Sequence, residues 1–107
     1  MDQPVSPPAT TGYNAFISLL ASEGVEYLFG NPGTTELAIM EALGTQSAVR
    51  YVLGLQEGVA VGMADGYARA SGRLAAANVH VAPGLGNAMG SLYNAKFYGS
   101  PLLLTAS

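Results

Sequence analysis

An acidic residue, Glu57, opens a run to Ala68 in which almost every residue is apolar or small. An ionised carboxylate in apolar surroundings is strongly disfavoured unless a hydrogen-bond donor or an opposite charge meets it. The sequence therefore predicts a specific partner for Glu57, as expected for an acid that takes part in proton chemistry. The alternative is a first-turn glutamate that complements the dipole of its helix, a role worth about 0.3–1 kcal/mol.

His80 is the second residue that could do chemistry, and it is the one histidine of the sequence. It stands near the end of a predicted strand, and ligands in open parallel sheets bind beyond the carboxyl ends of the strands. A lone histidine beside apolar residues can equally be a packed core residue. Because the sequence has no cysteine and no second histidine, it does not favour a zinc site, and without a G-x-S-x-G segment it does not favour a Ser/His/Asp triad.

Three glycines follow His80 with the spacing Gly84-x-Gly86-x-x-x-Gly90. A dinucleotide-binding turn has the spacing G-x-G-x-x-G, follows the first strand of its fold and is followed about 20 residues later by an acid. None of these conditions holds here, so a nicotinamide or flavin site is not favoured. A structural role for the glycines is the simpler interpretation.

The composition contains few charges: 10% of the 107 residues are charged and 50% are hydrophobic, against roughly 25% charged in an ordinary soluble domain. Much of such a surface is expected to face other protein, either a partner chain or further domains. Four Lys/Arg and seven Asp/Glu without a basic cluster argue against nucleic-acid and anionic-membrane partners. No apolar run approaches the roughly 18 residues of a membrane span, and the Pro-rich start is unlike a signal peptide, so we expect a cytoplasmic protein.

The pattern of elements predicts one α/β domain over residues 11–107, preceded by an irregular Pro-rich arm at 1–10. Helices are predicted at 13–22 with Thr11 as the cap, 36–43, 57–70 closed by Gly72, and 87–98; strands are predicted at 25–29, 50–53, 75–81 and 102–105. Strands that alternate with helices predict right-handed crossovers, and hence a parallel sheet with helices on both faces. The sequence stops directly after the last predicted strand, so we expect the domain to be incomplete.

Gly58, Gly62 and Gly66 recur every four residues and therefore share one face of the third predicted helix. Each costs roughly 1 kcal/mol of helix propensity relative to alanine, so a close neighbour is expected at this face. That neighbour is either the protein's own sheet or a helix of another subunit.

The three loops expected at the carboxyl ends of the strands carry a resemblance to a known family. The segments are 29–36 (FGNPGTTE), 56–68 (QEGVAVGMADGYA) and 78–90 (NVHVAPGLGNAMG). Together they resemble the amino-terminal pyrimidine-binding domain of thiamine diphosphate-dependent enzymes, over about residues 11–107. Within that family the resemblance is to the benzoylformate decarboxylase type, in which a histidine also precedes the glycine loop. Acetolactate synthase-like enzymes share the first two segments but usually lack that histidine.

The resemblance implies three residues that act in the reaction. Glu57 would activate the cofactor by sharing a proton with the pyrimidine nitrogen opposite the amino group, and His80 would carry protons in the steps after decarboxylation. Thr34 matches a hydroxyl that contacts the substrate carboxylate. The residues that the resemblance places around the cofactor itself are Asn31, Pro32, Gly33, Gly84 and Asn87.

The activity that the resemblance implies is decarboxylation of a small 2-oxo acid, in a homo-oligomer with its active site at the subunit interface. The family binds the diphosphate and Mg²⁺ with a separate carboxyl-terminal domain that has a G-D-G…N motif, and no part of this sequence matches it. We therefore expect no metal ligand in this chain, and no activity of the chain alone. The alternatives are an acetolactate synthase-like carboligase and a non-catalytic dimerisation module of the same fold.

Overall fold

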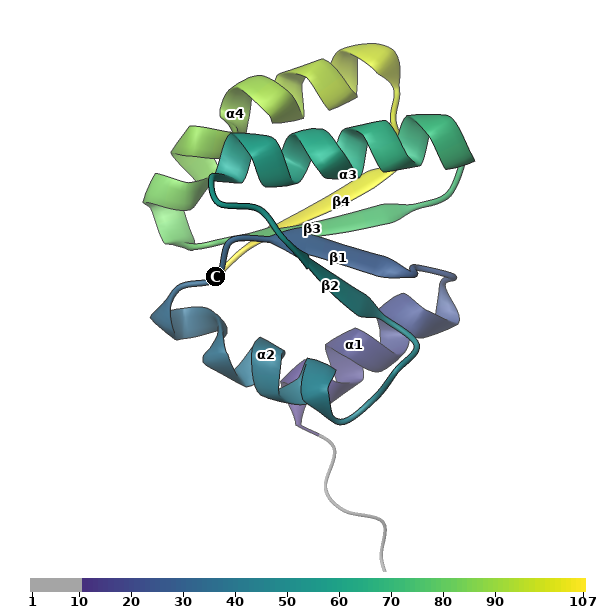
Figure 1. Ribbon diagram of the computed structural model, residues 1–107, viewed down its shortest axis with the longest axis vertical. Helices are drawn as coiled ribbons and strands as arrows, with labels where there is room; N and C mark the ends of the chain where they lie inside the picture. Colours follow the sequence, from purple (N-terminus) through teal and green to yellow (C-terminus); the bar gives the residue numbers. More distant parts are fainter. Residues whose placement is uncertain (1–10) are drawn as a thin grey trace, which may run out of the picture.

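The computed structural model describes residues 11–107, so the predicted arm at 1–10 lies outside the described residues. Within this range helices and strands alternate as predicted (Figure 1). The elements are α1 Gly12–Ser22, β1 Tyr27–Gly30, the 3-10 turn η1 Thr34–Glu36, α2 Leu37–Gly44, β2 Arg50–Leu53, α3 Glu57–Ser71, β3 Ala75–Val79, α4 Val81–Tyr98 and β4 Leu102–Ala106.

The strands form one parallel sheet in the order β2-β1-β3-β4. Leu28 of β1 is level with Tyr51 of β2 and with Ala76 of β3. On the other side of β3, Ala77 is level with Leu104 of β4. The predicted parallel α/β sheet is confirmed.

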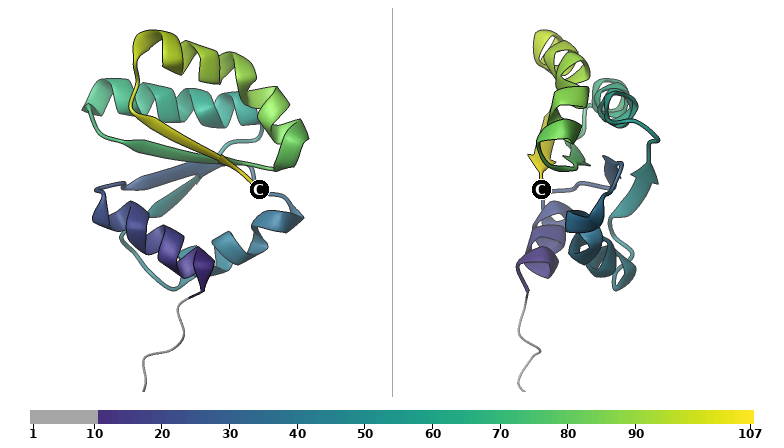
Figure 2. Two further views of the ribbon diagram at one scale, coloured as in Figure 1. Left: turned by 180° about the vertical axis from the view of Figure 1, so that it is seen from behind. Right: turned by 90° about the vertical axis from the view of Figure 1, so that its left-hand side faces the viewer.

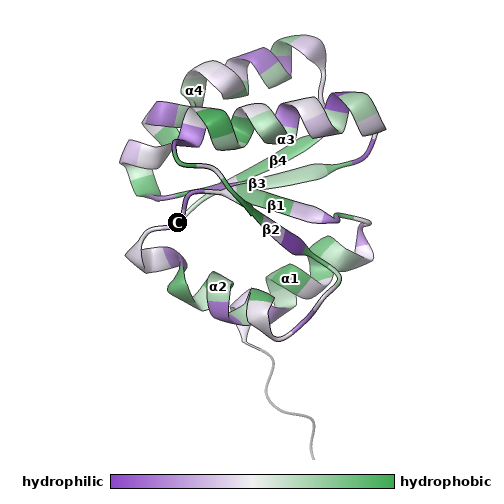
Figure 3. Cartoon of the chain, in the orientation of Figure 1, coloured by the Kyte–Doolittle hydropathy of each residue, from purple (hydrophilic) through white to green (hydrophobic). Residues whose placement is uncertain are grey.

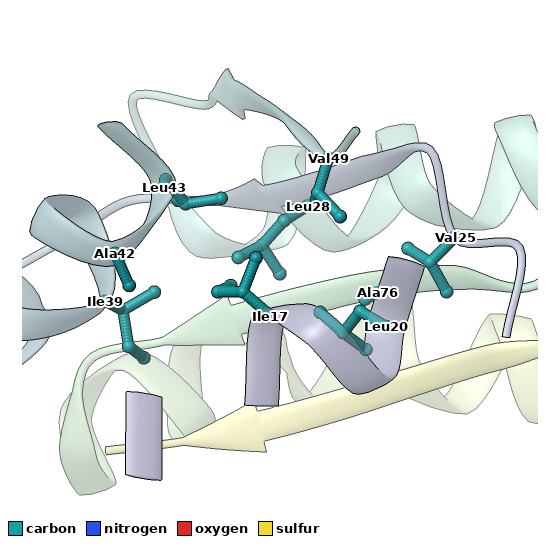
Figure 4. Packing of buried hydrophobic residues seen from close by; sticks show 9 residues of the cluster. All are labelled: Ile17, Leu20, Val25, Leu28, Ile39, Ala42, Leu43, Val49 and Ala76. Carbon is teal, nitrogen blue, oxygen red and sulfur yellow. The ribbon is translucent and has the colours of Figure 1, made fainter. Parts of the chain in front are cut away.

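Helices cover both faces of the sheet, with α1 and α2 on one face and α3 and α4 on the other (Figures 1 and 2). Successive side chains of a strand point to opposite faces, and β1 shows this directly. Leu28 packs with residues of α1 and α2 such as Ile17 (Figure 4), whereas Phe29 packs with Val61 of α3. β4 is coloured as an apolar strand in Figure 3. The core is therefore two apolar layers with the sheet between them.

Sequence signals at two helix ends are confirmed by the backbone geometry. The Thr11 side chain accepts a hydrogen bond from the N–H of Asn14 at 3.1 Å, which caps α1. Gly72 ends α3 with a φ of 70°, a conformation that glycine adopts without steric cost. No helix between residues 11 and 107 is both long and apolar enough to cross a lipid bilayer.

The glycine-rich segment after β3 is helical, so the predicted loop and the predicted helix start at residue 87 are wrong. α4 begins at Val81, and the N–H of Gly84 donates to the carbonyl of His80 at 2.8 Å. Pro83 is tolerated because it stands in the first turn, where its missing N–H has no helical partner to lose. Glycines lower helix propensity, but tertiary packing of α4 against α3 overrides that preference.

The junction between β3 and α4 is a sharp change of backbone direction at Val81. Its φ of 44° lies in the left-handed region, which costs a residue with a Cβ roughly 1–2 kcal/mol. The N–H of Val81 donates to the carbonyl of Ser107 at 2.8 Å. His80 is the single residue between β3 and α4, and it lies at the carboxyl end of β3.

The glycine stripe of α3 starts against α4 and then opens outward. A Cβ on Gly58 would stand 3.3 Å from the carbonyl oxygen of Asn87 in α4, so α4 explains Gly58. A Cβ on Gly62 would meet its nearest neighbour, the Ser91 hydroxyl, at 3.9 Å, and a Cβ on Gly66 would meet nothing within 4 Å. The residues of α3 buried against the rest of the protein are Ala60, Val61, Ala64, Asp65 and Ala68. Packing against the protein's own sheet therefore does not explain Gly62 and Gly66.

The connections after the two central strands leave toward opposite faces of the sheet. The chain after β1 continues through η1 into α2, on the face that α1 covers, whereas α4 follows β3 on the α3 face (Figure 2). A parallel sheet has a topological switch point where neighbouring strands diverge in this way, and ligands bind there. The loop after β1 and His80 after β3 meet at this point.

Candidate active site

Glu36 is the centre of a buried polar cluster at the switch point. Its side chain is 1% exposed although it is a carboxylate. Four donors surround it: the Gly33 N–H at 2.7 Å, the His80 ring at 2.9 Å, and the hydroxyls of Thr35 and Ser107 at 3.0 Å each. Burial alone would raise the pKa of Glu36, but these hydrogen bonds outweigh burial and hold the pKa below its usual range. Glu36 is therefore ionised at neutral pH.

The ionised carboxylate decides how the imidazole of His80 is oriented. Nδ1 lies 2.9 Å from Oε2 of Glu36 and 3.0 Å from the Thr35 hydroxyl. A carboxylate can only accept hydrogen bonds, so the proton of a neutral ring belongs on Nδ1. Nε2 then carries the free lone pair, and the side chain is 33% exposed. Such a ring can take up and release a proton at Nε2.

Gly33 lies directly against the His80 ring. A Cβ at position 33 would stand 2.6 Å from Cγ and Nδ1 of the imidazole, closer than real atoms approach. The φ of Gly33 is −111°, so the backbone itself would admit other residues. Glycine is needed here for space rather than for backbone conformation.

Tyr51 reaches the same cluster from β2. A Cβ at position 30 would stand 2.6 Å from the Tyr51 hydroxyl, so Gly30 makes room for the phenol to cross β1. Burial, followed by the negative charge of Glu36, raises the pKa of Tyr51 to about 12. The phenol is therefore neutral at neutral pH, and its ring packs against the apolar layer on the α1 and α2 face of the sheet.

Glu57 is the first residue of α3, at the carboxyl edge of the neighbouring strand β2. The predicted partner is present: Nδ2 of Asn87 donates to Oε2 of Glu57 at 3.2 Å. The predicted apolar enclosure is not, because Leu55 is 87% exposed and Val59 is 56% exposed. Leu55 and Val59 adjoin Glu57 in the sequence, but their side chains point outward because α3 starts at the rim of the sheet. Glu57 itself is half-buried.

Gly84 lies behind Glu57. A Cβ at position 84 would stand 3.5 Å from Cγ of Glu57 and 3.3 Å from Cβ of Val79. Gly84 is buried, and it packs between Val79 at the end of β3 and Glu57 at the start of α3. Glu57, Gly84 and Asn87 thus form one group of neighbouring residues. Gly33 and His80 belong to the cluster around Glu36.

The remaining predicted site residues line the loop after β1. Asn31 and Pro32 are half-buried in this loop. Thr34 begins η1 and is exposed, and the hydroxyl that contacts His80 is that of Thr35.

The sequence did not single out Thr35 and Glu36, which contact the His80 ring, although both lie within a matched segment. A signal existed, because a glutamate three residues after the start of a helical turn folds back to accept the first N–H. That spacing would have directed the Glu36 carboxylate toward Gly33, and hence toward the end of β1.

The residues at this edge fit the cofactor that the resemblance implies. The half-buried acid Glu57 accepts a hydrogen bond from Asn87 at Oε2, which leaves Oε1 for another partner. The missing Cβ atoms of Gly33 and Gly84 make room for the His80 ring and for Val79 and Glu57. A cofactor that needs an acid beside an amide matches the pair of Glu57 and Asn87. Within the described part of the chain, no group of three or more His, Cys, Asp or Glu side chains could hold a metal ion.

Fold and site together define an open α/β domain with a polar cluster at its switch point. The model of the family "Thiamine pyrophosphate enzyme, N-terminal TPP binding domain" matches residues 10–107. The chain therefore belongs to this family, as predicted.

Curated relatives include both a decarboxylase and an acetolactate synthase. Benzoylformate decarboxylase of Pseudomonas aeruginosa is 48% identical over 96 residues, which cover 90% of this chain and 18% of the relative. The acetolactate synthase large subunit of Haemophilus influenzae is 36% identical over 94 residues, which cover 88% of this chain and 16% of the relative.

Solved structures agree with the fold. The crystal structure of benzoylformate decarboxylase from Polynucleobacter necessarius superposes with a TM-score of 0.81 at 36% identity, over 89% of this chain and 18% of that chain. The chain spans less than a fifth of the length of the relatives it matches.

Proposed function

We propose that this domain forms part of a thiamine diphosphate-dependent 2-oxo acid decarboxylase of the benzoylformate decarboxylase type. The observation that carries the proposal is His80, held by Glu36 at the end of β3 with Nε2 free. A proton carrier at this place is what release of an aldehyde after decarboxylation requires. The 48% identity to a benzoylformate decarboxylase supports the same reading.

Glu57 would be the acid that activates the cofactor. Asn87 engages Oε2 and fixes the plane of the carboxyl group, so Oε1 is the oxygen left to exchange a proton with a ring nitrogen. Asn31, Pro32, Gly33 and Gly84 would contact the cofactor through backbone and small side chains. When bound, thiamine diphosphate supplies the nucleophilic carbon and the electron sink that decarboxylation needs.

His80 would move protons at Nε2, on the substrate side of the ring. Nδ1 keeps its proton and donates it in a hydrogen bond to Glu36, so the ring keeps its orientation while Nε2 gains and loses a proton. Thr34, exposed at the start of η1, would donate its hydroxyl to the substrate carboxylate.

Diphosphate and Mg²⁺ would be held by another domain, outside the residues of this chain. We infer a homo-oligomer in the cytoplasm, with this edge of the sheet at the subunit interface. The exposed glycines of α3 and the low content of charged residues support an interface on the α3 side.

An acetolactate synthase-like carboligase is the second candidate, and the 36% identity to such a large subunit favours it. Both candidates would use Glu57 in the same way, but a carboligase joins the activated substrate to a second 2-oxo acid instead of protonating it. A non-catalytic dimerisation module would need neither Glu57 nor His80.

Product analysis separates the candidates. The complete protein that carries this chain, supplied with thiamine diphosphate and Mg²⁺, is incubated with benzoylformate and separately with pyruvate. We expect benzaldehyde and carbon dioxide in equal amounts from benzoylformate. Acetolactate from pyruvate as the main product would favour the carboligase, and no product from either acid would favour the module.

A further inference from the structure

A chain of directed hydrogen bonds runs behind the imidazole of His80, from the interior of the sheet. It begins at Asn78 of β3, which is 4% exposed and points to the α1 face. Nδ2 of Asn78 donates to the Ser107 hydroxyl at 3.2 Å, and that hydroxyl donates to Oε1 of Glu36 at 3.0 Å. The other oxygen of Glu36, Oε2, accepts a hydrogen bond from Nδ1–H of His80.

The direction of each bond follows from the number of hydrogens available. An amide nitrogen can only donate, so the Ser107 oxygen must accept from Asn78. The single hydroxyl hydrogen of Ser107 is then left for Glu36. The second N–H of Asn78 is engaged by the Thr105 hydroxyl at 2.8 Å, which holds the amide in this orientation.

Thr35 is the place where the cluster could change state. Its one hydrogen has three acceptors within reach: Ser107 carbonyl oxygen at 2.8 Å, Oε1 of Glu36 at 3.0 Å, and Nδ1 of His80 at 3.0 Å when that atom has no proton. A full set of donors on Glu36 keeps the carboxylate ionised and keeps the imidazole proton on Nδ1. With a donor missing, the Glu36 carboxyl group would take up a proton more readily. A protonated Glu36 would donate to Nδ1, and the proton of a neutral ring would then sit on Nε2.

We propose that Asn78 is a positioning residue that, through Ser107 and Glu36, fixes the tautomer of His80 with Nε2 free. The effect on turnover rests on the proposed function, whereas the effect on the tautomer does not. Asn78 lies inside the sheet, where its amide group contacts the hydroxyls of Thr105 and Ser107. It acts only by setting the direction of the Ser107 hydroxyl.

The test reads the tautomer directly by ¹⁵N NMR of the imidazole, with the signals of His80 assigned by their loss in His80→Gln. Spectra are recorded on the complete protein across a pH titration, so that the neutral ring is sampled. Asn78→Asp preserves shape but offers acceptors in place of donors, and Ser107→Ala removes the hydroxyl. Asn94→Asp makes the same change at an exposed site of α4, and Ser107→Thr restores the hydroxyl.

We expect the unaltered protein, Asn94→Asp and Ser107→Thr to hold the neutral ring as the Nδ1–H tautomer. Asn78→Asp and Ser107→Ala should lower the ratio of Nδ1–H to Nε2–H by roughly fivefold or more, as the loss of one ordinary hydrogen bond implies. Circular dichroism shows which variants are folded. If the carboxylate introduced by Asn78→Asp prevents folding, the result of Ser107→Ala decides alone. An unchanged ratio in folded Ser107→Ala would overturn the proposal.

Turnover measured on the same preparations separates this inference from the proposed function. A shifted tautomer together with slower decarboxylation at unchanged cofactor affinity supports both. A shifted tautomer with unchanged turnover supports the positioning role of Asn78 and counts against His80 as proton carrier.

Discussion

Nδ1 of His80 lies 2.9 Å from Oε2 of Glu36, so the one histidine of the sequence is anchored by a carboxylate that is almost fully buried. The two residues are 44 positions apart and come from the connections after β1 and β3. Their pairing turns an isolated imidazole into a ring of fixed orientation.

Replacement of the imidazole tests its role in turnover. His80→Ala in the complete enzyme should slow decarboxylation of an aromatic 2-oxo acid by about 10²–10⁴-fold, the range typical of general acid–base residues, with cofactor binding nearly unchanged. Turnover and thermal melting are measured on one preparation. If the melting temperature falls while the folded enzyme turns over at the normal rate, His80 is a core residue and the carboligase gains support.

Acid stability tests the hydrogen bonds to Glu36. Its pKa is lowered in the folded protein, so its contribution to stability is complete above the unfolded-state pKa of about 4.3 and is lost as the pH falls through the lower folded-state pKa. Glu36→Gln should lower the free energy of unfolding by about 1.5–3 kcal/mol at pH 7, as expected for hydrogen bonds to a charged group. It should also flatten the acid limb, the decrease of that free energy toward low pH. Urea unfolding between pH 7 and pH 3 measures both effects.

Glu41→Gln is the matched control, because Glu41 is exposed on α2. It should leave the free energy of unfolding and its acid limb almost unchanged. An acid limb of normal slope in Glu36→Gln would mean that other carboxyl groups cause the loss of stability.

The space between Gly33 and the imidazole gives a third prediction. Gly33→Ala should displace the ring, since the added Cβ would lie 2.6 Å from Nδ1. Displacement of a reacting group by about 1 Å can cost on the order of 10²-fold in rate. Steady-state kinetics should show this loss in kcat. Gly44→Ala, at a helical position with nothing within 4 Å, should keep normal kinetics; equal rates in the two variants would refute the close contact.

The exposed face of α3 gives a fourth prediction. Gly62→Leu should weaken association of subunits with little change in folding stability, because the position has open space within its own chain and a branched side chain would overpack a helix of a partner. Sedimentation of the complete protein measures the association. Ala70→Leu, on the exposed last turn of the same helix, is the control. An unchanged oligomer in Gly62→Leu would place the interface elsewhere.

Much of the fold could be predicted from the sequence because local signals and tertiary packing agree. The strand at 50–53 is confirmed to the residue, and Thr11 and Gly72 mark helix ends by their side-chain chemistry and backbone freedom. The start of α4 was missed because glycine and proline at 83–86 disfavour a helix locally. Packing against α3 supplies the stabilisation that propensity lacks.

The site was predictable only in part, for a related reason. Glu57 and Asn87 belong to recognisable segments, and they do meet. The pairing of Glu36 with His80 depends on the crossing of two chain connections at the switch point, which no local pattern specifies. The outward direction of Leu55 also depends on the position of the helix start at the rim of the sheet.

A role of Glu57 in activating thiamine diphosphate can be measured as the exchange of the C2 proton of the bound cofactor with deuterium, followed by NMR after rapid quenching. Glu57→Gln in the complete enzyme keeps the shape of the side chain and its contact with Asn87, so the cofactor should still bind. We expect C2 exchange in this variant to slow by at least the 10²–10⁴-fold of a lost acid–base residue. Exchange at the normal rate with cofactor bound would remove Glu57 from the mechanism.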